Sequence, residues 1–536
     1  MLADRVFISG KILTMNNSQP VAEAVATRQD KIIGVGTNRE ILQLIGEKTR
    51  IVNLDGKTMV PGFIDSHIHV LDFGKTMAWL NLTRVNSISE LQQILTEHSE
   101  KLPKGDWILG RGWNEIRFVE KRFPTASDLD SCSPNNPVVF YHENSLICAV
   151  NNVALRQACI TKSTEPTADG VIDKDEKTGA PTGILRGSAT DLVWREVPPP
   201  SDEELKRLTA LALAKIVEAG ITSVHWIVLS ANEISIAKKL DFERRLPVRV
   251  FLIVPAALLD KTVDLKLCCD SMLRLGGGLL ITDGYLASKT AALSQPYQHG
   301  SSRGKLVCSQ RELMSSVKKI LDSGLQLVVQ AMGDKAIEIS LNTIQNSLKA
   351  FCSKNPRYRL EQAAVLNPIL IERMKRQDLI LSIQPCVIAS EFVVWKAKEN
   401  LGPKRVRWLY PLQTLLDAGL NIAAGSDSPM EPLNPLVGIQ TVVAGDFRLE
   451  EQISVNEALR MYTIGAAFAS QEEHLKGSIE EGKLADLTVL SADPLSVHPK
   501  NIAQIAVEMT IVGGKLVFSR TSTTSETVSK NSLETD

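Results

Sequence analysis

Eight short apolar runs recur through the centre of the chain and constrain its fold more than any other feature. They occupy residues 60–70, 221–226, 248–254, 278–283, 325–330, 359–365, 379–384 and 420–427. Helical patterns separate most of them, over residues 202–219, 311–323, 335–351 and 408–418. Short apolar runs that alternate with amphipathic helices are typical of buried parallel strands. Eight of them predict an α/β fold, a (β/α)8 TIM-like barrel whose active site lies at the carboxyl ends of the strands.

Both ends of the chain have a different, β-rich pattern. Short runs separated by turns occur over residues 6–13, 22–28, 31–36 and 50–56, and again over 477–490 and 506–519. We expect the two ends to form one small β-sandwich domain, made of residues 1–60 and 475–520. The barrel then spans 61–474, with a long insertion at about 71–200 that is expected to cover its mouth. Residues 521–536 are rich in Ser, Thr and Glu and predict a disordered tail.

Composition narrows the classes of function. Apolar residues make up 44% and charged residues 23% of the 536 positions, as in a soluble globular protein. The formal net charge of -1 gives no reason to expect nucleic acid or a membrane as a partner. The eight cysteines lack metal-ligand spacing, and the start of the chain lacks a signal-peptide pattern. We therefore expect a cytoplasmic protein that acts on a small molecule, with a homodimer as the default oligomer.

The first apolar run contains two histidines that could hold a metal. His67 and His69 point the same way from the strand, because side chains alternate along it. Asp427 ends the eighth run, and the first and eighth strands are neighbours in a closed barrel. Two imidazoles and a carboxylate suit a catalytic zinc, iron or manganese ion and leave room for water. Taken alone, an exposed histidine pair and a helix-capping aspartate are the simpler interpretations.

These residues lie within a series of motifs that resembles the amidohydrolase superfamily, and closely its amidohydrolase-3 (YtcJ-like) branch. The resemblance runs from about residue 5 to about residue 518. Its motifs include Pro61 to His69, Gly112-Trp-Asn-Glu115, Val150-Asn-Asn-Val-Ala-Leu155, Pro181 to Arg186, Asp283-Gly284, Gly333-Asp334, Gly425-Ser-Asp-Ser-Pro429 and Gly477 to Asp486. The resemblance implies a metal-bearing barrel that hydrolyses C–N or related bonds. It assigns metal binding to His67, His69 and Asp427, catalysis to Asp427, and substrate binding to Trp113 and Asn151.

The chain departs from the family pattern where further metal ligands are expected. Leu279 replaces a lysine that often bridges two metals, and Gln330 and Gln362 replace two histidines. Leucine binds no cation, and a neutral amide oxygen is a much weaker zinc ligand than imidazole. We therefore expect one divalent metal at most, weakly held or absent, with Gln330 and Gln362 contacting substrate instead. Leu146, Trp226, Val387 and Gly187 also replace polar residues of the family, and His142 and His225 are candidate replacement ligands.

Two functions fit this pattern. The first is a mononuclear hydrolase in which a metal-activated water attacks a non-peptide or cyclic amide and Asp427 moves the proton. The second is a catalytically degenerate member that keeps the barrel and binds a ligand or partner without hydrolysis. Leu146, Trp226 and Leu279 near the mouth favour an apolar or aromatic substrate.

Overall fold

In a computed structural model, the centre of the chain forms an eight-stranded parallel sheet, in the order β21-β20-β19-β18-β17-β16-β15-β8. The structure describes residues 1–143, 147–165, 170–262, 272–350 and 357–520. The strands are β8 (Phe63–Ile68), β15 (Ile221–Ile227), β16 (Arg249–Pro255), β17 (Leu273–Ile281), β18 (Gln326–Ala331), β19 (Arg359–Gln362), β20 (Ile380–Ile383) and β21 (Asn421–Ala424). Each corresponds to one of the eight predicted runs, which confirms the predicted TIM-like fold class.

Backbone hydrogen bonds join the two ends of this sheet. The Asp427 amide donates to the His67 carbonyl over 2.8 Å, and the His69 amide donates to the Ser428 carbonyl over 3.0 Å. The segment after β21 is therefore held against the end of β8. Because strands in a barrel are neighbours at this closing seam, residues far apart in sequence meet there.

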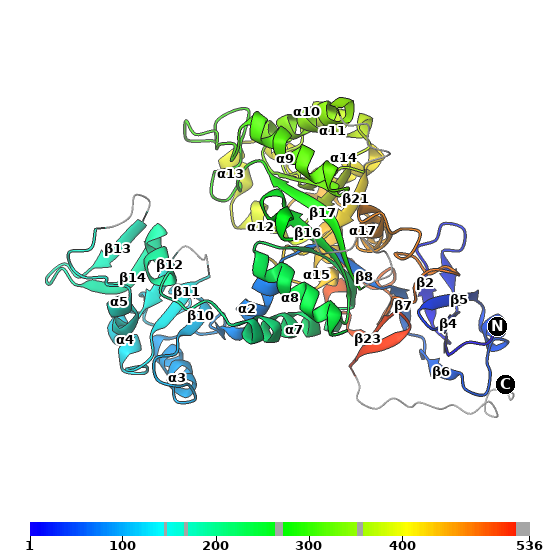
Figure 1. The fold of residues 1–536 in the computed structure, drawn as a ribbon, viewed down its shortest axis with the longest axis horizontal. Coiled ribbons are helices and arrows are strands. Elements are labelled where there is room, and N and C mark those ends of the chain that lie inside the picture. Colours follow the sequence, from blue (N-terminus) through cyan, green and yellow to red (C-terminus); the bar gives the residue numbers. More distant parts are fainter. Residues whose placement is uncertain (144–146, 166–169, 263–271, 351–356, 521–536) are drawn as a thin grey trace. The chain divides into compact units, whose positions relative to one another are not determined.

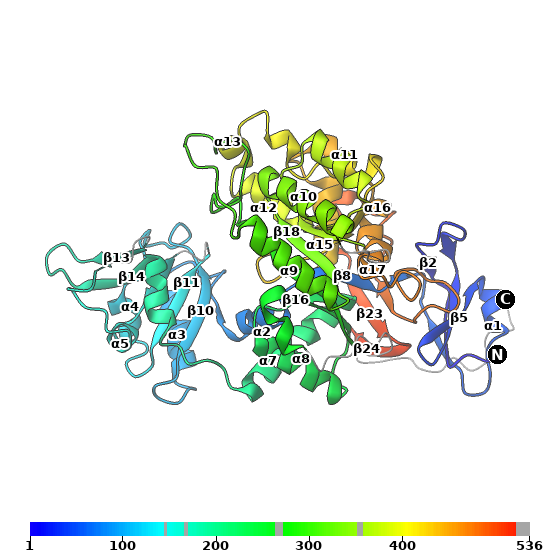
Figure 2. The same ribbon diagram turned by 45° about the horizontal axis from the view of Figure 1, so that its top comes forward.

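Helices follow most of the strands. They are α7 (Asp202–Glu218), α8 (Ala231–Phe242), α9 (Gln310–Asp322), α10 (Asp334–Ala350), α11 (Pro368–Arg376), α12 (Pro385–Val393), α13 (Ala397–Leu401), α14 (Leu412–Asp417), α15 (Pro435–Ala444), α16 (Val455–Met461) and α17 (Ile464–Ala469). Helices α9 and α10 pack against β18 (Figure 2). The start of α9 is set by a capping box, in which Ser309 and Glu312 each accept from the other's backbone amide.

The terminal segments form two mixed sheets. One has the order β5 (Lys31–Gly36), β4 (Ala24–Arg28), β1 (Arg5–Ile8) and β6 (Arg50–Asn53). The other has the order β24 (Lys515–Ser519), β23 (Val507–Val512), β22 (Leu487–Leu490), β7 (Thr58–Pro61), β2 (Lys11–Leu13) and β3 (Val21–Ala22). The blue strands β2 and β7 thus lie in one sheet with the red strand β23 (Figure 1).

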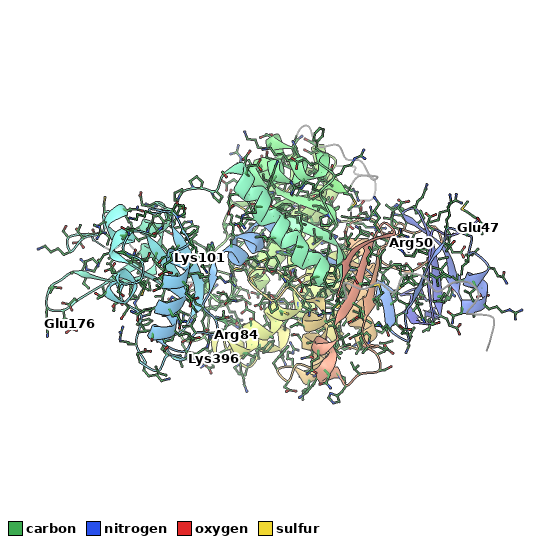
Figure 3. All side chains as sticks on the ribbon, turned by 90° about the horizontal axis from the view of Figure 1, so that it is seen from below. Glu47, Arg50, Arg84, Lys101, Glu176 and Lys396 are labelled. Atoms are coloured by element: carbon green, nitrogen blue, oxygen red, sulfur yellow. The ribbon has the colours of Figure 1, made fainter. Side chains whose placement is uncertain are left out.

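One apolar core joins the two terminal sheets. It contains Phe7 and Val25 from the first sheet and Ile12, Met59 and Ile511 from the second. This arrangement confirms a small β-sandwich built from both termini, while the residue boundaries given for the domains stay a prediction. Charged side chains such as Glu47 and Arg50 lie on the surface of this part of the chain (Figure 3).

Residues 71–211 form a second compact unit, separate from the unit of residues 1–70 and 212–536. Its sheet has the order β13 (Gly170–Lys174), β14 (Pro181–Gly187), β12 (Ile147–Val150), β11 (Val138–His142), β10 (Ile108–Trp113) and β9 (Leu80–Asn81). Helices α3 (Ile88–Ser99), α4 (Ala126–Asp130), α5 (Asn152–Gln157) and α6 (Asp191–Trp194) accompany the sheet, and α2 (Val70–Ala78) precedes it. That this insertion covers the barrel mouth stays a prediction.

The predicted tail, residues 521–536, and Leu146 lie outside the described residues. Within the described part of the chain, no helix combines the length and the apolar character that crossing a bilayer requires.

Candidate metal centre

His67, in β8, and His69, directly after β8, present the same ring nitrogen to one point. The Nδ1 atom of His67 lies 2.7 Å from Glu361 Oε2, and the Nδ1 atom of His69 lies 3.1 Å from the Ile227 carbonyl oxygen. Each acceptor therefore holds a proton on Nδ1. The Nε2 atom of each ring is the one that can offer its lone pair to a metal.

Asp427 supplies the third ligand atom. Its Oδ1 lies 3.4 Å from His67 Nε2 and 3.6 Å from His69 Nε2. The residue has φ 60°, a left-handed conformation that short polar residues tolerate and that turns the carboxylate inward. Burial alone would raise the pKa of Asp427, but the two imidazoles lower it well below its usual range.

A second aspartate holds the two strand ends together. Asp65 Oδ1 accepts hydrogen bonds from the His67 amide over 3.0 Å and from the Ser426 amide over 2.9 Å. Burial raises the pKa of Asp65 to about 6, while these hydrogen bonds act in the opposite direction. Gly425 lies beside this contact, and a Cβ there would strike the His67 amide and approach Asp65 Oδ1 within 3.0 Å. Close packing of the two backbones thus fixes the spacing of the ligands.

The sequence predictions did not include the buried ion pair behind His67. Glu361 and Arg359 are fully buried, and Arg359 Nε contacts Glu361 Oε1. Burial would raise the pKa of Glu361, but the charge of Arg359 and the bond to His67 lower it. The sequence did contain a signal for this pair, since two opposite charges two positions apart share one face of a fully buried strand. The pair keeps a charged acceptor on His67 Nδ1.

The protonation of His67 follows from these neighbours. Burial would lower its pKa, but the negative charges of Asp427 and Glu361 raise it to about 10. A metal ion binding at Nε2 would displace the proton held there.

His225 is the opposite case. Burial and the adjacent Arg359 guanidinium, whose Nη1 lies 2.8 Å from His225 Nδ1, hold its pKa well below the usual range. His225 is therefore a neutral, buried histidine and does not join the group formed by His67, His69 and Asp427.

The substituted ligand positions differ from one another in the structure. Leu279 is 2% exposed and packs with Ile227, Phe251, Ile253 and Val328 inside the barrel. The two glutamines instead border the candidate centre. Gln330 Nε2 lies 3.3 Å from Gln362 Oε1, and Gln362 Nε2 lies 3.4 Å from Asp427 Oδ2. Gln330 and Gln362 are therefore linked to Asp427, and their contact with a substrate stays a prediction.

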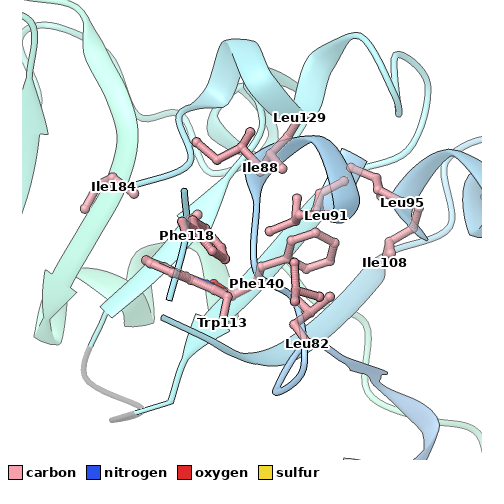
Figure 4. Packing of buried hydrophobic residues seen from close by; sticks show 13 residues of the cluster. Leu82, Ile88, Leu91, Leu95, Ile108, Trp113, Phe118, Leu129, Phe140 and Ile184 are labelled. Atoms are coloured by element: carbon pink, nitrogen blue, oxygen red, sulfur yellow. The ribbon is translucent and has the colours of Figure 1, made fainter. Parts of the chain in front are cut away.

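The other two predicted substrate-binding residues have structural roles instead. Trp113 is fully buried in the core of the second unit, where its indole N–H donates to the Phe140 carbonyl over 2.7 Å (Figure 4). Asn151 is also fully buried. Its Oδ1 accepts from two backbone amides and its Nδ2 donates to two backbone carbonyls. No polar atom of either side chain is left for a substrate, because each already has its partners.

The remaining candidates contact other side chains. His142 Nε2 lies 3.1 Å from Glu115 Oε2 within the second unit, and its ring packs edge-on against Trp113. Trp226 is fully buried, with its indole N–H directed at Glu233 of α8 over 3.1 Å. Since Trp226 and Leu279 are core residues, neither lines the mouth as expected for an apolar substrate.

The three converging side chains fit a divalent metal. Their ligand atoms all lie within 4.8 Å of one another. In a tetrahedral site with bonds near 2.1 Å, ligand atoms lie about 3.4 Å apart. The separations of 3.4 and 3.6 Å between Asp427 and the imidazoles agree with that spacing. A ligand set of two imidazoles and one carboxylate leaves positions open for water and substrate.

Comparison with known proteins agrees with this fold. A sequence model of the Amidohydrolase family matches residues 50–518. The amidohydrolase YtcJ of Bacillus subtilis is 33% identical, over 96% of this chain and 99% of its own length. An N-substituted formamide deformylase of Arthrobacter pascens is 26% identical, over 97% of this chain and 99% of its own length.

A solved structure supports the same assignment. A metal-dependent hydrolase of Pyrococcus furiosus superposes with a TM-score of 0.78 at 27% identity, covering 92% of this chain and 100% of that one. Together with the barrel and its histidine-carboxylate group, these matches define the class as metal-dependent hydrolases of the TIM-barrel type. The chain belongs to the amidohydrolase family.

Proposed function

We propose that this protein is a mononuclear metal-dependent hydrolase that cleaves a C–N bond in a non-peptide or cyclic amide. The observation that carries the proposal is the convergence of His67 Nε2, His69 Nε2 and Asp427 Oδ1, with both Nδ1 atoms held by acceptors. At the positions of Leu279, Gln330 and Gln362 a second metal has no strong ligand, because Leu279 is an apolar core residue and the two glutamines are neutral. Zinc is the proposed metal, with iron or manganese as the alternatives.

A divalent metal at these ligands supplies Lewis-acid activation of water and of the substrate carbonyl. The chain's own residues supply the proton transfers. Asp427 is ionised at neutral pH, and its Oδ2 is directed toward Gln362. This oxygen accepts the proton of the attacking water and returns it to the departing nitrogen. Gln330 and Gln362 orient the amide by hydrogen bonds from their side chains.

The relatives support the type of bond. The formamide deformylase is named for removing a formyl group from nitrogen, which is hydrolysis of a C–N bond. Its match extends over nearly the whole of both chains. Substituted formamides and small cyclic amides are therefore the first compounds to assay.

Metal content of the purified protein tests the proposal. We expect about one zinc, iron or manganese ion per chain, lost in His67→Ala/His69→Ala and kept in His474→Ala, which removes an exposed histidine. Asp427→Asn is expected to lower amide hydrolysis by about 10²–10⁴-fold. Protein that holds no metal even after dialysis against all three ions would contradict the proposal and favour a degenerate barrel that binds a ligand without hydrolysis.

A further inference from the structure

Three acceptor groups without a cationic partner in the described part of the chain follow the consecutive strands β19, β20 and β21. Glu391 lies on α12, after β20, and Glu431 lies four residues beyond Asp427. Tyr410 lies at the exit of β19, where its amide donates to the Ala364 carbonyl over 2.8 Å. Strands β19, β20 and β21 are consecutive in the barrel, so their following segments meet at one side of the mouth.

Two polar atoms of this cluster are buried and lack a hydrogen-bond partner among the described residues. Glu391 is 6% exposed, and its Oε2 accepts no hydrogen bond among the described residues. Tyr410 is 1% exposed, and its hydroxyl also lacks a partner there. A buried polar atom without a partner costs about 1–3 kcal/mol, so such atoms call for a ligand or water.

The carboxylates also lack compensating charge. Within the described ranges, no Lys, Arg or His forms an ion pair with Glu391 or Glu431. Burial raises the pKa of Glu431, and the neighbouring Ser390, next to Glu391, acts in the opposite direction. Burial raises the pKa of Glu391 to about 8, and the charge of Glu431 acts in the same direction. Burial raises the pKa of Tyr410 well above its usual range, and the charges of Glu391, Asp427 and Glu431 act in the same direction.

The residues around the cluster are apolar and exposed. Val393 is 67% and Val394 78% exposed at the end of α12, and Met430 is 67% exposed beside Glu431. Tyr285 is 52% exposed, and burial raises its pKa, which Gln330 and the charge of Asp427 both affect as well. A molecule bound next to Glu391 and Glu431 would therefore have both apolar and acidic side chains near it.

We propose that Glu391, Glu431 and Tyr410 bind a positively charged nitrogen of the substrate, so that the hydrolysed amide belongs to an organic cation with an apolar body. A primary ammonium has three N–H donors, and the cluster offers three acceptor groups. The statement that the substrate's amide is hydrolysed next to Asp427 rests on the proposed function. The cation site itself rests on the cluster.

Binding of two matched probes tests this inference. Benzylammonium and benzyl alcohol have nearly the same shape and differ in charge, and their affinities for the full-length protein can be measured by calorimetry. We expect benzylammonium to bind about tenfold more tightly, with the preference kept at 0.5 M NaCl because a buried pair is screened little. Glu391→Gln and Glu431→Gln should each remove most of this preference. Glu399→Gln, an exposed glutamate on α13, should leave it within about twofold.

The outcomes separate this inference from the proposed function. Equal affinities for the two probes, or equal losses in Glu391→Gln and Glu399→Gln, would overturn the cation site even if the protein holds zinc and hydrolyses amides. Preference for benzylammonium in a protein that never binds metal would keep the cation site and refute the hydrolase. Thermal unfolding of each variant identifies misfolding, and Glu431→Gln, at a less buried position, decides the matter if Glu391→Gln does not fold.

Discussion

The Glu361→Gln substitution tests whether the charge behind His67 controls metal binding. The glutamine can still accept a hydrogen bond from His67 Nδ1, which lies 2.7 Å from the present carboxylate. It cannot supply the negative charge that makes the imidazole a stronger ligand. Loss of such a partner typically lowers metal affinity by about 10–100-fold, which corresponds to about 1.4–2.7 kcal/mol.

The same substitution has a second effect on stability. It leaves the guanidinium of Arg359 fully buried without its ion-pair partner. Breaking a buried pair from one side costs about 3–5 kcal/mol. We therefore expect a lower free energy of unfolding together with weaker metal binding.

Competition with a chromophoric zinc chelator at pH 7 measures the affinity, and denaturant unfolding measures the stability. Glu473→Gln is the matched control, because it breaks the ion pair between Glu473 and Arg357. Both side chains of that pair are about a quarter exposed, and the pair lies outside the metal centre. Its expected cost is at most about 1 kcal/mol, with zinc affinity unchanged. A Glu361→Gln protein that binds zinc within about twofold of wild type would refute the role given to this carboxylate.

Two further substitutions probe buried positions. Glu391 has a pKa of about 8 in the folded protein against 4.5 when exposed, so the folded state holds its proton longer. Wild-type stability should therefore fall between about pH 4.5 and 8, and urea unfolding of Glu391→Gln should show a smaller fall; parallel pH profiles would contradict this. Leu279→Lys should destabilise the protein by about 3 kcal/mol or more and still bind one metal, since it buries an amine among apolar side chains. Two metals per chain in Leu279→Lys would contradict this expectation and show that a single lysine restores the second metal site.

The barrel strands were predictable because each is a short run whose apolar side chains have to be buried. The fourth strand shows where this reasoning stops, since β17 begins at Leu273 and the prediction began at 278. Gly276 and Gly277 suggest a turn when read alone. In the structure a Cβ on Gly276 would strike the Phe251 ring, so the glycine allows close packing within the strand.

The site was predictable only in part, for a related reason. Strand periodicity and barrel closure place His67, His69 and Asp427 together, and the structure does bring them together. The role of Glu361 depends on which strand faces His67 across the barrel, which is a matter of tertiary packing. Trp113 and Asn151 lie in motifs of the resemblance, but a motif does not reveal whether its side chains serve packing or binding. Glu391 and Tyr410 belong to no motif and become apparent only as buried atoms without partners.

The seam between β8 and the segment after β21 makes the centre one of the last parts of the molecule that can form. Ser426 and Asp65, which hydrogen-bond across it, are 361 residues apart in the chain. During synthesis, the two histidines emerge long before the aspartate that completes their ligand set. A nascent chain therefore has only a bidentate histidine pair, and tight metal uptake waits for ring closure. Any metal bound afterwards links the first and last strands and slows the opening of the barrel.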